Sequence, residues 1–189
     1  MLTGKRVSRR GASAILLATG IYTGICTASV QAETVSTPSK AFTDALTAYD
    51  AAWEANGLAF SVATFTQDGG TAYGQYTPHK DAIFQEDDVL SIYAEPIGYS
   101  FSQTDGIYAF ELTASYRLVN LSGQVLAEQD NFAVFSGEGR SKQRELAAAL
   151  SFQFSGLPAG DYQLETRFSD DEGGKVAGFT LPFTIADPK

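Results

Sequence analysis

The stretch Leu150–Phe168, which reads LSFQFSGLPAGDYQLETRF, decides the fold class of this chain. Apolar residues recur at every second position on both sides of a short segment from Gly156 to Gly160. A period of two is typical of a half-buried β-strand, and Gly with Pro between two such runs indicates a turn. The stretch therefore predicts two strands joined by a tight connection.

The same alternation recurs along the chain and predicts seven strands in all. They are expected near residues 58–65, 89–95, 107–119, 124–129, 144–155, 161–168 and 175–185. Seven short strands separated by turn signals favour a β-sandwich over an alternating β–α–β fold. Residues 144–150 also have strong helix propensity, so a helix stays open there as the alternative to a strand.

One helix is expected ahead of the strands, over residues 38–56. Thr37-Pro38 suits an N-cap followed by the first helical position, and Gly57 is a natural stop. Apolar side chains then recur at helical spacing on one face, formed by Phe42, Leu46, Tyr49 and Trp53. We expect this amphipathic helix to cover an edge or an open face of the sheet, with docking on a partner as the alternative.

The first 32 residues are predicted to be a signal peptide that is cleaved after Ala32. A basic start precedes an apolar run from Ala12 to Ile25, and Val30-Gln31-Ala32 suits a signal peptidase. The apolar run has about 14 residues, which is short for a bilayer span, and an uncleaved anchor is the alternative. Ser8-Arg9-Arg10 leaves twin-arginine export open beside the general secretory route.

This reading divides the chain into four parts. Residues 1–32 are the signal peptide, 33–37 a linker, 38–56 the helix and 57–186 the β-sandwich domain. The protein is therefore expected in the periplasm or outside the cell.

The chain is strongly acidic, with 13 Lys and Arg against 22 Asp and Glu and a net charge of −9. Removing the signal peptide leaves nine basic and 22 acidic residues, so the net charge becomes −13. Such a surface repels nucleic acid and anionic lipid, and we expect neither as a partner, nor stable membrane insertion once the signal is removed. The one cysteine, Cys26, lies in the signal peptide, so the mature chain has no disulfide.

No catalytic residue, metal site or cofactor is predicted. His79 is the only histidine, no G-x-S-x-G elbow is present, and one histidine without cysteine cannot ligate zinc. Acidic residues cluster at Asp170–Glu172 and at Asp87-Asp88, but neither cluster matches a calcium loop. We interpret both as solvated turn residues.

The segment Leu157–Leu164, LPAGDYQL, resembles the L-x-x-G-x-Y-x-L entry to the sixth strand of immunoglobulin-like sandwiches. The resemblance implies an all-β, seven-stranded, immunoglobulin-like antiparallel sandwich with one N-terminal amphipathic helix. It also implies a structural corner made of Tyr162, Leu157 and Gly160, in which the tyrosine hydroxyl turns back to a backbone group. The chain lacks the cysteine pair of antibody domains, and its last strands resemble those of exported bacterial domains.

That strand order would bring alternate loops together at one end of the sandwich. The loops 97–106, 130–143 and 169–174 share the end that binds antigen in antibody variable domains. They carry the residue types that dominate interfaces, namely Tyr99, Phe101, Phe132, Phe135, Arg140, Lys142 and Arg144. The alternative is that the three basic residues only pair with the acidic turn Asp170–Glu172.

Three functions follow from these patterns. The first is a non-catalytic, exported binding or interaction module for an envelope protein or glycan. The second is a carboxylate-dependent hydrolase that acts on an envelope carbohydrate or peptide and uses the 70–88 loop with His79. The third is a structural subunit that assembles by edge-strand pairing.

Overall fold

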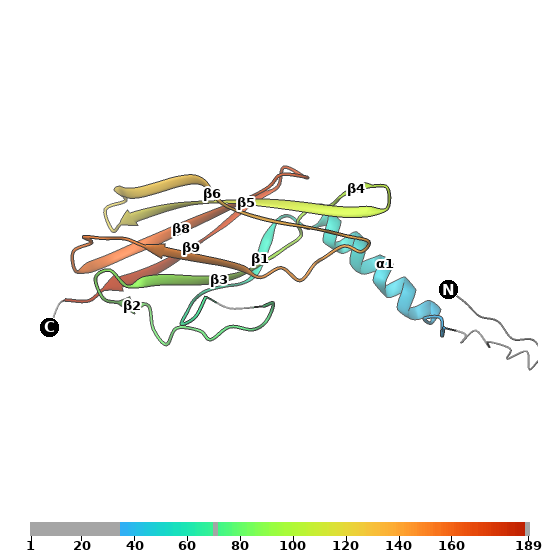
Figure 1. Ribbon diagram of the computed structural model, residues 1–189, viewed down its shortest axis with the longest axis horizontal. Coiled ribbons are helices and arrows are strands. Elements are labelled where there is room, and N and C mark those ends of the chain that lie inside the picture. Colours follow the sequence, from blue (N-terminus) through green and yellow to red (C-terminus); the bar gives the residue numbers. More distant parts are fainter. Residues whose placement is uncertain (1–34, 70–71, 188–189) are drawn as a thin grey trace, which may run out of the picture. The chain divides into compact units, whose positions relative to one another are not determined.

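The computed structural model describes residues 35–69 and 72–187 (Figure 1). The predicted signal peptide, its cleavage site and the first two linker residues lie outside these ranges. Within them, no helix is long and apolar enough to cross a membrane. Pro38–Lys189 forms a compact unit of its own and holds every helix and strand described below.

One helix and nine strands make up the described part of this unit. The helix α1 spans Lys40–Ala55, with Ser39 rather than Thr37 as its N-cap. The strands are β1 (Ala59–Thr66), β2 (Ile83–Phe84), β3 (Val89–Ile97), β4 (Ser102–Thr104), β5 (Ile107–Asn120), β6 (Val125–Gly139), β7 (Ala148–Gln153), β8 (Gly160–Asp170) and β9 (Val176–Ile185). Each of the seven predicted strands overlaps one of these, whereas the pattern does not predict the short strands β2 and β4.

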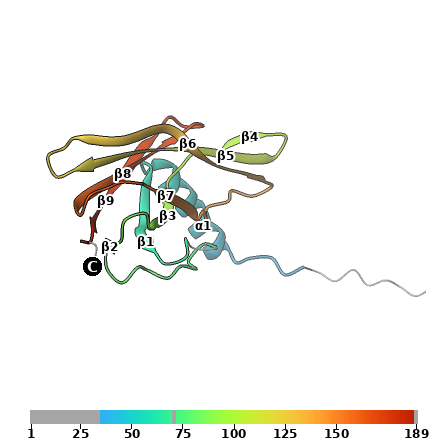
Figure 2. The same cartoon turned by 60° about the vertical axis from the view of Figure 1, so that its left-hand side comes forward.

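The strands form two sheets. The smaller sheet has the order β1-β3-β7, and the larger has the order β2-β9-β8-β5-β4, with β6 paired to the other edge of β5. Every pairing is antiparallel except that of β2 with β9. Figure 2 shows β5 and β6 above β1 and β3. The chain is therefore a mostly β protein with two stacked sheets, consistent with a β-sandwich.

The core lies between the sheets and is built from alternate residues of their strands. Leu90, Ile92 and Ala94 of β3 are buried, as are Leu164 and Phe168 of β8. Burial of each large apolar side chain stabilises the fold by about 1.5–3 kcal/mol. The period of two in the sequence is thus the direct result of facing a second sheet.

The stretch Leu150–Phe168 crosses from one sheet to the other. It contains the end of β7 in the smaller sheet and the beginning of β8 in the larger sheet. Tyr162 is buried at the start of β8, and its hydroxyl donates a hydrogen bond of 2.7 Å to the Pro158 carbonyl oxygen. The hydroxyl thereby ties the crossing connection to the strand that follows it.

The expected loop 130–143 is wrong, because β6 continues as far as Gly139. A bulge interrupts the pairing between β5 and β6, since Ala114 faces Ala133 and Tyr116 faces Gln129. Asn131 sits in this bulge with a φ of 51°. A bulge breaks the period-two pattern of a strand, and this break concealed the second half of β6.

The strand predicted at 144–155 is also shorter than expected. β7 begins only at Ala148, and residues 142–147 belong to no helix or strand. The helix considered for residues 144–150 is therefore not formed. Residues 148–150 pair with β3 instead, which shows that tertiary pairing outweighs helix propensity there.

The segment between β1 and β2 covers a polar cluster on the smaller sheet. Glu95 is buried and accepts hydrogen bonds from the Ser61 hydroxyl at 2.9 Å and the Tyr93 hydroxyl at 2.7 Å. The Gly74 amide donates to the Tyr93 hydroxyl oxygen at 2.6 Å, and the ring of Tyr76 stacks on that of Tyr93 at 4.3 Å. The segment is thus held by specific contacts, as its aromatic residues suggest.

We expect this cluster to make the protein unstable in alkali. Burial and the hydrogen bond to Glu95 raise the pKa of Tyr93 to about 12 from 10.0. As the pH rises, this tyrosine ionises in the unfolded chain before it ionises in the folded protein. The free energy of unfolding is therefore highest below pH 10 and falls as the pH rises toward 12, by at most about 3 kcal/mol. Urea unfolding at a series of alkaline pH values measures the loss. Tyr93→Phe should remove its share of this dependence, and a variant with the wild-type dependence would contradict the assignment.

Candidate functional site

Three loops meet at the end of the sandwich where α1 is attached. The Tyr99 hydroxyl donates to the Gln143 carbonyl oxygen at 2.6 Å, which joins the loop after β3 to the loop after β6. The Ser100 amide donates to the Asp170 carboxyl group at 2.9 Å, which joins the first loop to the β8–β9 hairpin. Segments around residues 99, 143 and 170 therefore converge at one end.

The helix α1 is fixed to this end by its C-terminal half. Trp53 is buried and its indole N–H donates to the Tyr99 carbonyl oxygen at 2.7 Å. The ammonium group of Lys175 binds three carbonyl oxygens at this junction, those of Glu54, Asn56 and Gly98, at 3.4, 3.0 and 2.7 Å. A cation at the C-terminal end of a helix also favours the helix dipole.

The remaining aromatic face of α1 is exposed, so the expectation that it covers the sheet is wrong. Phe42, Leu46 and Tyr49 are 55%, 47% and 48% exposed, whereas Trp53 is only 7% exposed. Helical spacing predicts which residues share one face of α1, but their burial depends on whether another element packs against that face. Of the four residues of this face, Trp53 is the one that is buried against the domain.

Two of the three basic residues of the loop after β6 pair with the helix and not with the acidic turn. Arg144 Nη2 lies 2.6 Å from Asp50 Oδ1, and Lys142 Nζ lies 2.6 Å from Glu54 Oε1. Four residues of helix rise about 6 Å, and two residues of extended chain span about 6.6 Å, so the two pairs match in spacing.

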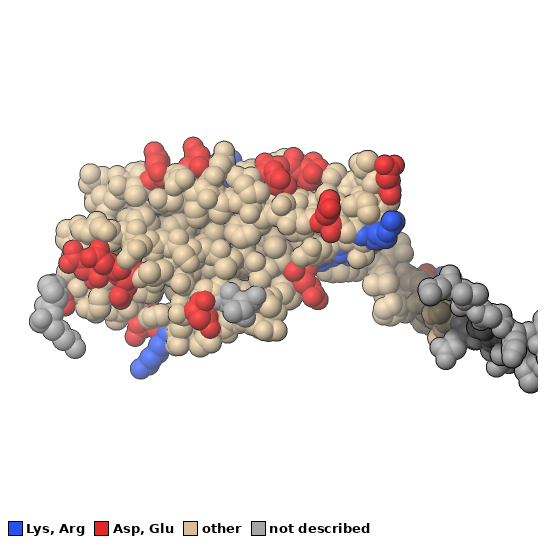
Figure 3. Space-filling model, viewed as in Figure 1, with Lys and Arg blue, Asp and Glu red and all other residues tan. Residues whose placement is uncertain are grey.

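Acidic side chains are far more common than basic ones on the face shown in Figure 3.

A cavity of about 410 Å³ opens beside Arg144. We call it the Arg144 pocket, and it is lined by Tyr49, Trp53, Tyr73, Ile97, Lys142, Gln143, Arg144 and Glu145. The Arg144 guanidinium lies 4.9 Å from the ring of Tyr49 and 5.3 Å from that of Trp53, both within the range of cation–π attraction. The group is thus fixed by two rings and one carboxylate.

The polar groups of this pocket suit hydrogen bonding to a ligand. Arg144 Nε is buried and has no hydrogen-bond partner among the described residues. Desolvation, followed by the charges of Glu95 and Glu145, raises the pKa of the Tyr73 phenol. Burial likewise raises the pKa of Tyr99 beneath the pocket.

The structure brings together only part of the predicted binding set. Lys142 and Arg144 line the pocket, and Arg140 is exposed on the same loop without an ion-pair partner among the residues described. The four aromatic residues pack against other rings of the protein instead. Tyr99 is fully buried, Phe101 packs on it, Phe132 contacts Phe152, and Phe135 stacks on Phe168.

Six residues that line the pocket are absent from the predicted binding set, namely Tyr49, Trp53, Tyr73, Ile97, Gln143 and Glu145. Tyr49 and Trp53 come from α1. Each is followed by an acidic residue, Asp50 and Glu54, and these acids are a sequence signal for pairing with the basic loop. Tyr73 and Glu145 gave no such signal. The corner residues Tyr162, Leu157 and Gly160 lie toward the opposite end, where β8 begins opposite Asn120.

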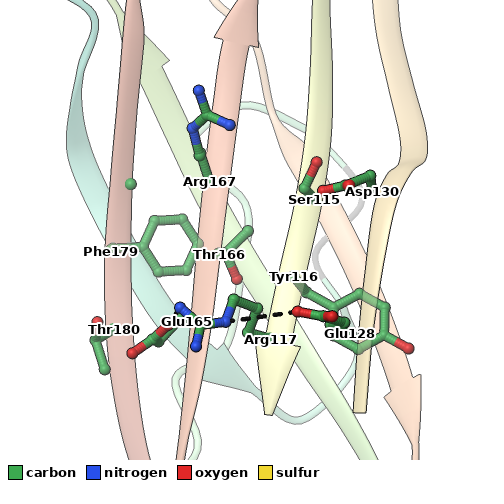
Figure 4. Close-up of a pocket in the computed structure, with 11 residues that line it drawn as sticks. Ser115, Tyr116, Arg117, Glu128, Asp130, Glu165, Thr166, Arg167, Phe179 and Thr180 are labelled. Atoms are coloured by element: carbon green, nitrogen blue, oxygen red, sulfur yellow. Dashed lines mark ion pairs between the residues drawn. The ribbon is translucent and has the colours of Figure 1, made fainter. Parts of the chain in front are cut away.

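A larger cavity, of about 570 Å³, lies along β9, β8, β5 and β6 of the larger sheet (Figure 4). The strand register arranges most of its side chains in two rows across the strands. The first row contains Gly178, Arg167 and Ser115 with Asp130 nearby, and the second contains Thr180, Glu165, Arg117 and Glu128. We call this surface the sheet trough.

Charges alternate along the second row of the sheet trough. Arg117 Nη1 lies 3.3 Å from Glu165 Oε2, and Arg117 Nε lies 3.7 Å from Glu128 Oε2. These side chains are exposed, so each ion pair contributes less than about 1 kcal/mol. At Gly178 an added Cβ would lie 2.5 Å from the Thr166 carbonyl oxygen, so a larger residue does not fit there without a shift. The floor of the trough at Gly178 is therefore backbone without a side chain.

Similarity to known proteins does not indicate a function for this chain. No protein-family model matches the sequence, and no curated protein is significantly similar to it. In the described ranges, no group of three or more His, Cys, Asp or Glu side chains is arranged to hold a metal ion. The His79 ring contacts the Asp81 carbonyl oxygen and the ring of Phe84, and its backbone N–H donates to the Phe65 carbonyl oxygen of β1 at 2.9 Å.

Proposed function

We propose that this chain is a non-catalytic, exported binding module and that its ligand, an envelope protein or a glycan, enters the Arg144 pocket. The observation that carries the proposal is the convergence of exposed aromatic rings on a fixed guanidinium group. Tyr49 and Tyr73 are both partly exposed at the pocket, and Arg144 is already immobilised between two rings. Aromatic and arginine side chains supply most of the energy of binding interfaces.

Preorganisation strengthens this reading. A flexible arginine loses rotamer entropy when it binds a ligand, which costs about 0.5–1.5 kcal/mol for a long side chain. Arg144 has lost that freedom before the ligand arrives, because Asp50 and the two rings hold it. The pocket therefore offers an aromatic and cationic surface at little further entropic cost.

The strand order supports an immunoglobulin-like sandwich as the scaffold. The order β1-β3-β7 against β9-β8-β5-β6 corresponds to strands A-B-E against G-F-C-C′ of that architecture. The hydrogen bond from Tyr162 to Pro158 supports the corner. In this reading β2 and β4 are short additions to seven main strands, and the loops at one end carry the ligand site.

The hydrolase alternative fits the pocket less well. A glycosidase that works by two carboxylates needs both of them beside the bond that is cleaved. The residues that line the Arg144 pocket include one carboxylate, Glu145. Binding is therefore the function that the geometry supports best.

The test uses Trp53, the only tryptophan of the chain, which lines the pocket. We expect the mature chain to capture its ligand from the envelope fraction, and the purified ligand to change Trp53 fluorescence when it binds. Tyr73→Ala and Arg144→Gln should each weaken binding at least about tenfold, equivalent to about 1.4 kcal/mol.

Arg140→Gln is the matched control, because Arg140 lies on the same loop with its charge exposed and unpaired among the described residues. It should bind like the wild type. Equal binding by all three variants, or equal loss in the control, would show that the ligand does not enter this pocket.

A further inference from the structure

The strand β6 has an unpaired edge. It spans Val125–Gly139, 15 residues, and pairs only with β5 among the described strands. From Ala133 to Gly139 its register with β5 is uninterrupted, so seven residues present a regular backbone edge about 24 Å long. Unpaired N–H and C=O groups on such an edge can pair with one more strand.

Partly buried aromatic residues lie beside this edge. Phe132 and Phe135 of β6 are half-buried and point toward the smaller sheet, where Phe132 contacts Phe152 of β7. β7 pairs only with β3 in the described structure, so its outer edge is open on the same side. A strand added to β6 would therefore cover apolar surface as well as backbone groups.

The charges of the sheet trough indicate what that strand would carry. Its second row runs from Glu165 through Arg117 to Glu128 and ends on an acidic residue at the edge (Figure 4). Asp130 and Glu138 are further acids on β6, neither has an ion-pair partner among the described residues, and the strand holds no Lys or Arg. Opposite charges on neighbouring strands stabilise a sheet, so the next residue in the row should be basic.

We propose that the outer edge of β6 binds an extended, basic segment of another protein as an additional strand. Backbone hydrogen bonds would supply affinity, and basic side chains facing Glu128 and Glu138 would supply specificity. A second copy of β6 suits this edge less well, because it brings three acids and no base. The inference is independent of the Arg144 pocket, since no residue is shared between the two surfaces.

Acidic residues and a bulge on an edge strand also serve to prevent aggregation. That role and the proposed one differ in a measurable way. A purely protective edge repels every added strand, whereas a binding edge discriminates by charge. The experiment therefore compares two peptides of opposite charge on the same edge.

The probes are two capped peptides of about ten residues, one alternating Lys with Val and the other alternating Glu with Val. Hydrogen exchange of the mature protein is followed by mass spectrometry with each peptide, at low and at high salt. We expect the Lys-Val peptide to slow exchange within residues 125–139 and the Glu-Val peptide to have no effect. High salt should weaken the binding, because exposed charges are screened.

The double variant Glu128→Lys/Glu138→Lys should bind the Lys-Val peptide about fivefold to tenfold more weakly and should gain binding to the Glu-Val peptide. Glu86→Lys/Glu172→Lys changes the net charge equally at exposed positions off β6 and should bind like the wild type. Both variants change exposed side chains, and circular dichroism checks that they fold.

Three outcomes would overturn the proposal. The first is unchanged exchange in residues 125–139 with the Lys-Val peptide, which would leave the acids a protective role only. The second is equal loss in both double variants, which would indicate nonspecific attraction. The third is a concentration-dependent dimer in sedimentation that protects the same amides, which would make a second copy the occupant.

Discussion

Replacing Trp53 with alanine is expected to lower the free energy of unfolding by about 3–5 kcal/mol, the usual cost of deleting a large buried aromatic side chain. The indole ring packs edge-on against Tyr99 at 5.2 Å and against Tyr49 at 6.1 Å. Its loss also leaves the Tyr99 carbonyl oxygen without its donor and removes one ring from the Arg144 guanidinium. The variant should therefore lose most of the attachment of α1 as well as stability.

The measurement is urea unfolding followed by far-ultraviolet circular dichroism, since the variant has no tryptophan. Leu46→Ala is the matched control, because Leu46 lies on the same helix face but is 47% exposed. It should change the free energy of unfolding by no more than about 0.5–1 kcal/mol. A similar loss in both variants would mean that the exposed part of the helix is packed against something in solution.

Asp170→Ala is expected to be comparably destabilising, at about 3–5 kcal/mol. The side chain is only 1% exposed and its two oxygens accept three backbone hydrogen bonds. The donors are the amides of Ser100 at 2.9 Å, Glu172 at 3.2 Å and Gly173 at 3.1 Å. Alanine would leave all three N–H groups without their acceptor and would separate the hairpin from the loop after β3.

Asp171→Ala provides the comparison at the adjacent position. Asp171 is exposed, and its carboxyl group accepts one hydrogen bond, of 2.6 Å, from the Thr113 hydroxyl. Its replacement should cost about 1 kcal/mol. Thermal unfolding of both variants gives the difference, and equal melting temperatures would show that the hydrogen bonds of Asp170 are not what holds the hairpin.

The sequence predicted the features that depend on local periodicity. Alternation located seven of the strands, and helical spacing located α1 to within two residues at its start. The same reasoning failed at Asn131, where a bulge shifts the alternation and turns the second half of β6 into an apparent loop. It also failed at β2 and β4, which have too few residues for any period to appear.

The candidate site was only half predictable, for a different reason. Aromatic residues in a predicted loop favour an exposed binding surface, but Tyr99 is buried because Trp53 of α1 packs on it. No local sequence pattern reveals which helix covers which loop. Lys142 and Arg144 are conspicuous in the sequence by their charge in an acidic chain, and both line the pocket. Their partners were assigned to the wrong acids, since Asp50 and Glu54 are about 90 residues away in sequence.

The placement of the two ends of the domain has a mechanical consequence. α1 leads into β1 at one end of the sandwich, and β9 finishes at the other (Figure 1). A force that pulls α1 away from the chain after Ile185 would run along β1 and β9 and load their hydrogen bonds to β3 and β8 in shear. Because these bonds lie across the strands, many would have to break together, and the sandwich would resist tension along this axis better than peeling from either edge.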